Sequence, residues 1–121
     1  MNLSKEHLRL YAITDRKWCT DNTLEKQIEA AIAGGVTILQ LREKNTDFDN
    51  FLSLALSVRK ITAKFNIPLI INDNVDIAIK CNADGVHVGQ NDSEIAEIRK
   101  LWGNDKIIGV SVKTVEAALL A

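Results

Sequence analysis

The feature of this sequence that most constrains its fold is a regular alternation between short, continuously apolar segments and longer segments with a helical apolar period. Five short segments have the composition of buried strands, at residues 8–13, 36–41, 68–72, 84–88 and 106–111. Helical patterns follow them at residues 23–33, 47–65, 75–82, 92–102 and from Thr114 onward. Continuous apolar strands that alternate with helices are typical of a parallel sheet covered by helices.

Residues that favour helix ends support these boundaries. Asn22 and Glu25 stand at capping-box spacing before the first helix, and the glycine pair at 34–35 ends it. Asp47 opens the second helix as an N-cap. The single proline, Pro68, is tolerable because it occupies the first position of the third strand.

Two architectures fit this order of elements: an open, doubly wound sheet and a (β/α)8 barrel. No GxGxxG motif follows the first strand, so the dinucleotide-binding form of the open sheet loses support. A complete barrel has eight units and about 250 residues. The chain has 121 residues. We therefore expect one α/β domain over residues 1–121, a truncated TIM-barrel type with about five parallel strands and four to five helices.

Composition argues against nucleic acid or a membrane as a partner and favours a reducing compartment. Fifteen basic and sixteen acidic side chains give a formal charge of −1, so no global field attracts nucleic acid or an anionic membrane, and a phosphate ligand needs a local site. No apolar stretch reaches the about 18 residues of a membrane span. The two cysteines, Cys19 and Cys81, form no CxxC motif, which favours a reduced, cytoplasmic protein without structural zinc.

The end of the second strand carries a candidate phosphate clamp. The sequence there reads QLREK at residues 40–44. A period of two places Gln40, Arg42 and Lys44 on one face, with Leu41 and Glu43 on the other. Two cations and an amide that converge at a strand end can hold a phosphate or pyrophosphate. The alternative is a solvated strand end in which Arg42 pairs with Glu43 or with a helix acid.

Acids at the next two strand ends form a candidate magnesium site. The third strand ends with Asn72 and Asp73, and the loop after the fourth strand reaches Asp92. Carboxylates at neighbouring strand ends can share one Mg²⁺, which prefers oxygen ligands and often retains water and substrate phosphates. The alternative is that Asp73 and Asp92 are N-caps, because a helix starts after each.

His87 and Ser111 are polar residues of the fourth and fifth strands. We expect His87 to be a hydrogen-bonded histidine of the core or behind the site, not a base. Ser111 either reaches a substrate or caps a turn. Nothing in the sequence places His87 beside Ser111 with an orienting acid, so no Ser–His–Asp set is expected. The cysteines fit core packing.

These strand ends carry a set of short motifs in a fixed order: LYAITD (10–15), GGVT (34–37), QLREK (40–44), IND (71–73), ADGVHVGQND (83–92) and IGVS (108–111). Together they resemble the thiamine-phosphate synthase family over nearly the whole chain, from about Leu8 onward. The resemblance implies a TIM barrel that joins a hydroxymethylpyrimidine diphosphate to a thiazole phosphate, with Mg²⁺ as cofactor and release of pyrophosphate.

The resemblance also implies roles for the strand-end residues. Gln40, Arg42 and Lys44 would hold the pyrimidine diphosphate, with Leu41 and Glu43 in the same segment. Asn72 and Ser111 would contact the pyrimidine side, and Asp73 and Asp92 would ligate Mg²⁺. No residue would serve as an acid or base.

The sequence departs from the family pattern in two places. Lys113 stands where the family usually has a histidine, and the related thiazole tautomerases use that histidine and lack the paired acids. The family's later segments, which hold the thiazole phosphate, have no counterpart in the chain. We therefore expect the chain alone not to catalyse the reaction, and to need a C-terminal half or a second copy. The alternatives are a non-catalytic half-barrel for binding or assembly, and a thiazole tautomerase relative.

Overall fold

The computed structural model describes residues 2–19, 23–89 and 92–121. Five strands alternate with five α-helices, and 3-10 turns η1 (Lys5–Leu8) and η2 (Arg16–Trp18) flank the first strand. The strands are β1 (Tyr11–Ile13), β2 (Ile38–Leu41), β3 (Leu69–Asn72), β4 (Gly85–Val88) and β5 (Ile107–Val110). The helices are α1 (Leu24–Ala33), α2 (Phe48–Lys64), α3 (Val75–Lys80), α4 (Asp92–Trp102) and α5 (Val115–Leu120).

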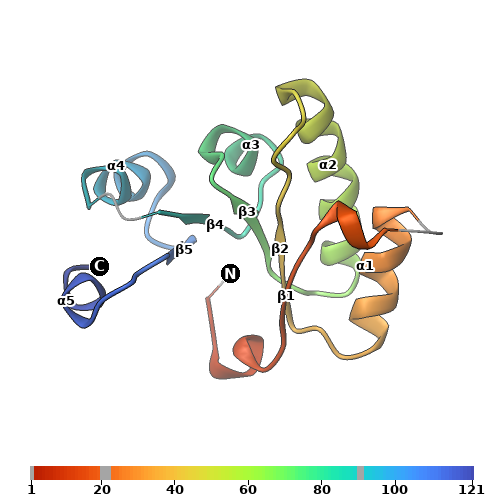
Figure 1. The fold of residues 1–121 in the computed structure, drawn as a ribbon, viewed down its shortest axis with the longest axis horizontal. Helices are drawn as coiled ribbons and strands as arrows, with labels where there is room; N and C mark the ends of the chain where they lie inside the picture. The colour runs from red at the N-terminus through yellow and green to blue at the C-terminus, as the bar shows by residue number, and fades with distance from the viewer. Residues whose placement is uncertain (1, 20–22, 90–91) are drawn as a thin grey trace.

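The order of the strands confirms the expected barrel type over the alternative, a doubly wound sheet. All five are parallel and lie in the order β1-β2-β3-β4-β5, so every strand pairs with its neighbours in the sequence. A doubly wound sheet reverses its strand order at a switch point, and this sheet does not. Figure 1 shows the strands as an open arc with the helices along its outside. The fold is α/β, of the TIM-barrel type, with five strands.

The apolar core lies between the outer face of the arc and the helices. Alternate residues of each strand point to it, as the pleat requires. The strand residues in this core are Leu39, Leu41, Leu69, Ile71, Val86 and Val88, and the helices add Leu24, Ile28, Ile32, Phe51, Ala55, Val58, Ile77, Ala78 and Ile98. The other strand residues point to the inner face, where polar side chains gather toward the carboxyl ends.

Most predicted helix starts are confirmed. Asp47 caps α2 by accepting a hydrogen bond from the N–H of Asn50 at 2.8 Å, and Thr114 caps α5. The cap of α1 is Thr23, whose hydroxyl accepts from the N–H of Lys26. Asn22, the other residue of the predicted capping box, lies outside the described residues.

Several predicted elements are shorter than expected, and for two of them the structure shows the reason. The first strand covers only Tyr11–Ile13, because residues Lys5–Leu8 form the turn η1, in which the N–H of Ser4 donates to Nδ1 of His7 at 3.0 Å. Helix α3 ends at Lys80 instead of residue 82, since Asn82 adopts a left-handed backbone conformation (φ 52°). No helix in the described part of the chain is long and apolar enough to cross a membrane.

A buried ion pair fixes the opposite end of the sheet. Asp84, just before β4, accepts from Nη1 of Arg59 on α2 at 2.7 Å and from the N–H of Leu69 at 2.8 Å. The Asp84 side chain is 6% exposed and that of Arg59 is 23% exposed. The carboxylate therefore links α2, β3 and β4 away from the carboxyl ends of the strands.

This pair yields a stability prediction. We expect Asp84→Ala to lower the free energy of unfolding by about 3–5 kcal/mol, because it leaves the Arg59 charge and the Leu69 N–H without their partner. Glu97→Ala, at an exposed acid on α4, should change it by at most about 0.5 kcal/mol. Urea denaturation of the two variants checks this, and equal effects would contradict it.

Candidate functional site

The candidate site is an open cavity of about 610 Å³ on the inner face of the arc, at the carboxyl ends of the strands. Active sites of parallel α/β barrels lie at this edge. Residues from all five strands or the loops after them line the cavity: Tyr11, Ile13, Thr14, Asp15, Trp18, Gln40, Arg42, Asn72, His87 and Ser111. Gln40, Arg42, Asn72 and Ser111, all predicted site residues, therefore face one cavity.

Gln40 sits in the middle of a hydrogen-bonded row that crosses three strands. Its Nε2 donates to the Tyr11 hydroxyl at 3.1 Å, and its Oε1 accepts from Nδ2 of Asn72 at 2.8 Å. Gln40 is only 3% exposed. Burial raises the pKa of the Tyr11 hydroxyl, and the hydrogen bond from Gln40 opposes this in part. The phenol therefore stays protonated at neutral pH, and the row holds the Asn72 amide in place.

Arg42 stands at the boundary between this cavity and a second one of about 630 Å³, which is lined by Asp15, Arg16, Lys17, Arg42, Glu43, Lys44, Asn45 and Thr46. The backbone N–H of Arg42 donates to the Thr14 hydroxyl at 3.0 Å. Glu43 pairs with Arg16, with both carboxylate oxygens 2.8–3.0 Å from Nε. The alternative in which Arg42 pairs with Glu43 is therefore wrong. No carboxylate among the described residues pairs with Arg42.

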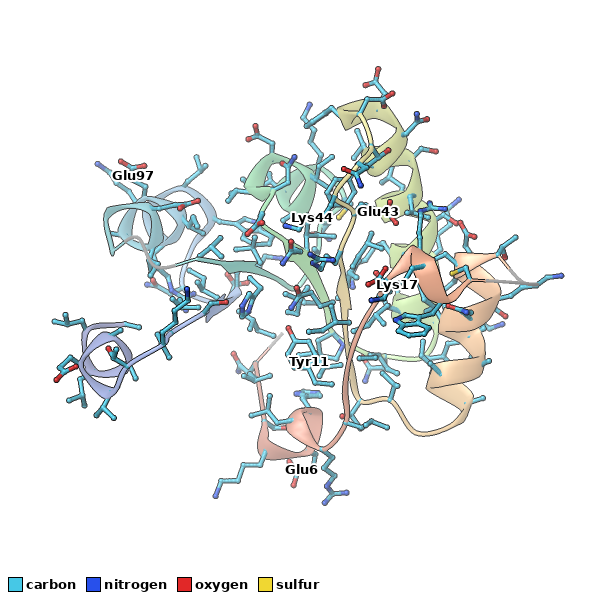
Figure 2. All side chains as sticks on the ribbon, viewed as in Figure 1. Glu6, Tyr11, Lys17, Glu43, Lys44 and Glu97 are labelled. Carbon is cyan, nitrogen blue, oxygen red and sulfur yellow. The ribbon has the colours of Figure 1, made fainter. Side chains whose placement is uncertain are left out.

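The predicted alternation of faces holds only as far as the strand does. Leu41 is fully buried, and its side chain belongs to the outer core. Beyond Leu41 the strand ends, and Glu43 and Lys44 line the same second cavity although they were expected on opposite faces. Figure 2 shows both side chains near the carboxyl end of β2, with Lys17 across from them.

Asp73 lies at the end of β3 and pairs with Lys44, with Oδ2 2.6 Å from Nζ. The alternative in which Asp73 caps the next helix is wrong: Asn74 is the cap, and its Oδ1 accepts from the N–H of Ile77 at 3.0 Å. Asp73 itself has a left-handed backbone (φ 64°), a conformation that aspartate tolerates but that is uncommon outside glycine. Its carboxylate is therefore presented at the edge of the sheet without a capping role.

The predicted partner of Asp73 is only partly placed. Asp92 is the first residue of α4, and its side chain lies outside what the structure describes. Within the described part of the chain, no group of three or more His, Cys, Asp or Glu residues could hold a metal ion. The pairing of Asp73 with Asp92 around Mg²⁺ stays a prediction.

His87 and Ser111 are in direct contact, which the sequence did not indicate. Nε2 of His87 lies 2.9 Å from the Ser111 hydroxyl. His87 is paired in register with Gly109, and a Cβ at Gly109 would lie far inside van der Waals distance of His87 Nδ1. The glycine therefore makes room for the ring. No described carboxylate contacts Nδ1, so a Ser–His–Asp set is not formed by these residues.

A family model described as thiamine monophosphate synthase matches residues 10–121. The chain belongs to this family. The thiamine-phosphate synthase of Ruminiclostridium cellulolyticum is 52% identical over 118 residues, which cover 98% of this chain and 56% of the relative. The thiamine-phosphate synthase of Clostridium acetobutylicum is 53% identical over 113 residues, which cover 93% of this chain and 54% of the relative.

A solved structure agrees with these relatives. Thiamine phosphate pyrophosphorylase from Pyrococcus furiosus matches with a TM-score of 0.84 and 32% identity, over 94% of this chain and 55% of that one. The chain therefore spans about half the length of the curated thiamine-phosphate synthases that it matches. The five-stranded arc is shared with a protein of the same family.

Sequence reasoning missed four residues that shape the site. Tyr11 is the first residue of β1 and Thr14 directly follows that strand, and both hydrogen-bond to the segment 40–42. The position of Thr14 at the strand end was a usable signal, because all parallel strands end at the same edge. Arg16 and Gly109 had no such signal, since their roles depend on contacts with Glu43 and His87.

The contact between His87 and Ser111 yields a structural prediction. We expect Gly109→Ala to displace the imidazole, to lengthen the distance from His87 Nε2 to the Ser111 hydroxyl beyond hydrogen bonding, and to cost about 1–3 kcal/mol of stability. A crystal structure of the variant and the ¹⁵N shifts of the imidazole check this. Gly89→Ala is the matched control, because a Cβ there would meet no atom of the described residues within 4 Å beyond its chain neighbours.

Proposed function

We propose that the protein acts in thiamine-phosphate synthesis, as a transferase that joins a hydroxymethylpyrimidine diphosphate to a thiazole phosphate and releases pyrophosphate. The observation that carries this proposal is Arg42, whose side chain borders both cavities at the carboxyl edge of the sheet and has no acidic partner among the described residues. A free guanidinium beside a cavity of about 610 Å³ suits a ligand that joins a small ring to a diphosphate. The family supports the same assignment.

In this proposal the ring and the diphosphate occupy adjoining spaces. Asn72 and Ser111 contact the pyrimidine in the cavity on the inner face, and the Gln40 row orients the Asn72 amide. Arg42 and Lys44 bind the diphosphate at the boundary with the second cavity. Leu41 and Glu43 belong to the same segment, but the Leu41 side chain is in the core and the Glu43 carboxylate is paired with Arg16.

Asp73 and Asp92 are the residues that would hold Mg²⁺. The Asp73 carboxylate fits this ion because it is a hard oxygen donor, its side chain is 56% exposed, and the flexible Lys44 is its ion-pair partner. Mg²⁺ commonly takes one or two carboxylates and completes its shell with water and substrate phosphate oxygens. When bound, the ion supplies positive charge to the leaving diphosphate.

The side chains suit a reaction driven by departure of the diphosphate. Arg42 and Lys44 stabilise the negative charge that grows on the leaving oxygens, more strongly in the transition state than in the bound substrate. The electron-rich aminopyrimidine bears the positive charge left on its methylene carbon until the thiazole nitrogen captures it. No general base is needed, so the contact with His87 serves to orient the Ser111 hydroxyl.

The chain accounts for the pyrimidine and metal side of such a site. The proposal assigns the thiazole phosphate to the part of the relatives' length that the chain does not span. It also places the reaction in the cytoplasm, which is supported by Cys19 and Cys81, both free thiols as is usual in reducing compartments.

We expect Arg42→Ala to weaken binding of the pyrimidine diphosphate by about ten- to a hundredfold, the value of a bidentate charge-assisted contact. Glu43→Ala should weaken it much less, because the Glu43 carboxylate is bonded to Arg16. Isothermal titration calorimetry in the presence of Mg²⁺ measures both. Equal losses would mean that the diphosphate does not lie at Arg42, and the proposed function would fail.

We expect Asp73→Ala and Asp92→Ala to remove the Mg²⁺ dependence of diphosphate binding and to be markedly non-additive, since loss of either ligand already disrupts a shared ion site. Titrations of the single and double variants with and without Mg²⁺ test this. Additive losses of about 1 kcal/mol in thermal stability, with the Mg²⁺ dependence retained, would instead indicate local structural roles.

A further inference from the structure

The acid next to Arg42 in the sequence is a problem for a diphosphate site. Arg42 and Glu43 line the same cavity of about 630 Å³, together with Arg16, Lys17 and Lys44. A carboxylate in this position repels an anionic ligand and competes for the guanidinium that should bind it. Because β2 ends at Leu41, the strand pleat does not hold the two side chains on opposite faces.

The structure resolves this conflict through the loop after β1. Arg16, the first residue of the turn η2, places Nε 2.8 Å and 3.0 Å from the two carboxylate oxygens of Glu43. The Glu43 side chain is only 5% exposed in this pair, whereas that of Arg16 is 59% exposed. Arg16 therefore covers the carboxylate and uses both of its oxygens.

The other ion pairs show which cation of the cavity has no acidic partner once Arg16 is paired with Glu43. Lys17 lies 4.0 Å from the Asp15 carboxylate, and Lys44 lies 2.6 Å from that of Asp73. Of the four cations that line the cavity, Arg42 alone lacks an acidic partner within the described part of the chain. Its freedom depends on Arg16, since Glu43 is the acid next to it in the chain.

We propose that Arg16 is a positioning residue that sequesters the Glu43 carboxylate and so leaves Arg42 free to bind the diphosphate. This inference rests on the proposed function and deepens it. Arg16 does not itself touch the ligand. It acts by occupying the acid that would otherwise neutralise the clamp.

The test separates this role from a merely structural one. Arg16 also attaches η2 to the end of β2, so Arg16→Ala could weaken binding by loosening the loop. If the acid is responsible, Glu43→Gln in the Arg16→Ala background removes it and restores binding. If the loosened loop is responsible, the double variant still lacks the ion pair that attaches the loop, and Glu43→Gln does not restore binding.

The probe is inorganic pyrophosphate with Mg²⁺, titrated calorimetrically into the full protein. We expect Arg16→Ala to weaken binding about tenfold, the value of one charge-assisted contact, and Arg16→Ala with Glu43→Gln to recover most of that loss. Lys17→Ala is the matched control, because it removes a cation from the same turn that does not contact Glu43. Its effect should be clearly smaller. Arg16→Gln, which removes the charge but keeps a polar side chain, should behave as Arg16→Ala.

Each outcome has a distinct meaning. Failure of the double variant to recover, or pyrophosphate binding by Arg16→Ala as tight as in the parent, overturns the role of Arg16 while Arg42→Ala still marks the diphosphate site. If the parent binds no pyrophosphate and no pyrimidine diphosphate, the proposed function fails and this inference fails with it.

Discussion

The site depends on the register of five parallel strands that end at one edge. Asn72 is paired with His87 and His87 with Gly109, while Gln40 is paired with Ile70, one pleat before Asn72. This offset lets the amides of Gln40 and Asn72 meet on the inner face. A slip of one residue in β2 would turn Gln40 into the outer core and Leu41 into the cavity. The apolar residues that fix the register therefore also fix the site.

The sequence predicted the elements and the edge because both follow from local patterns. Apolar runs and capping residues such as Asp47 specify strands and helix starts without reference to distant residues. Gln40, Arg42, Asn72 and Ser111 were found for the same reason: each stands at or beside the end of a run, and parallel strands bring such ends together. The absence of a GxGxxG motif already favoured a barrel over a dinucleotide-binding doubly wound sheet, and the strand order confirms that prediction.

The failures occurred where a pattern stopped or where two candidates competed. Glu43 lies beyond the end of β2, so the alternation of the strand does not predict which way its side chain points. The pairing of Glu43 with Arg16 could therefore be seen only in the structure. Asp73 and Asn74 are both good caps, and only one can occupy the position before α3; Asn74 does, which leaves Asp73 with positive φ. His87 meets Ser111 because Gly109 lacks a side chain, a tertiary effect that no spacing rule covers.

The ion pairs of this protein differ in burial, and therefore in their contribution to stability and in how readily a ligand can replace one partner. Arg59 and Asp84 are mostly buried and tie three elements together, so breaking their pair leaves a charge that water solvates poorly. Lys44 and Asp73 are about half exposed, and such pairs contribute only about 0–1 kcal/mol. Lys44 can therefore exchange its partner for a phosphate oxygen at little cost. The pair of Arg16 and Glu43 joins an exposed cation to a buried acid. In the proposed role, its main effect is on the charge that a ligand meets near Arg42, and its effect on stability is smaller.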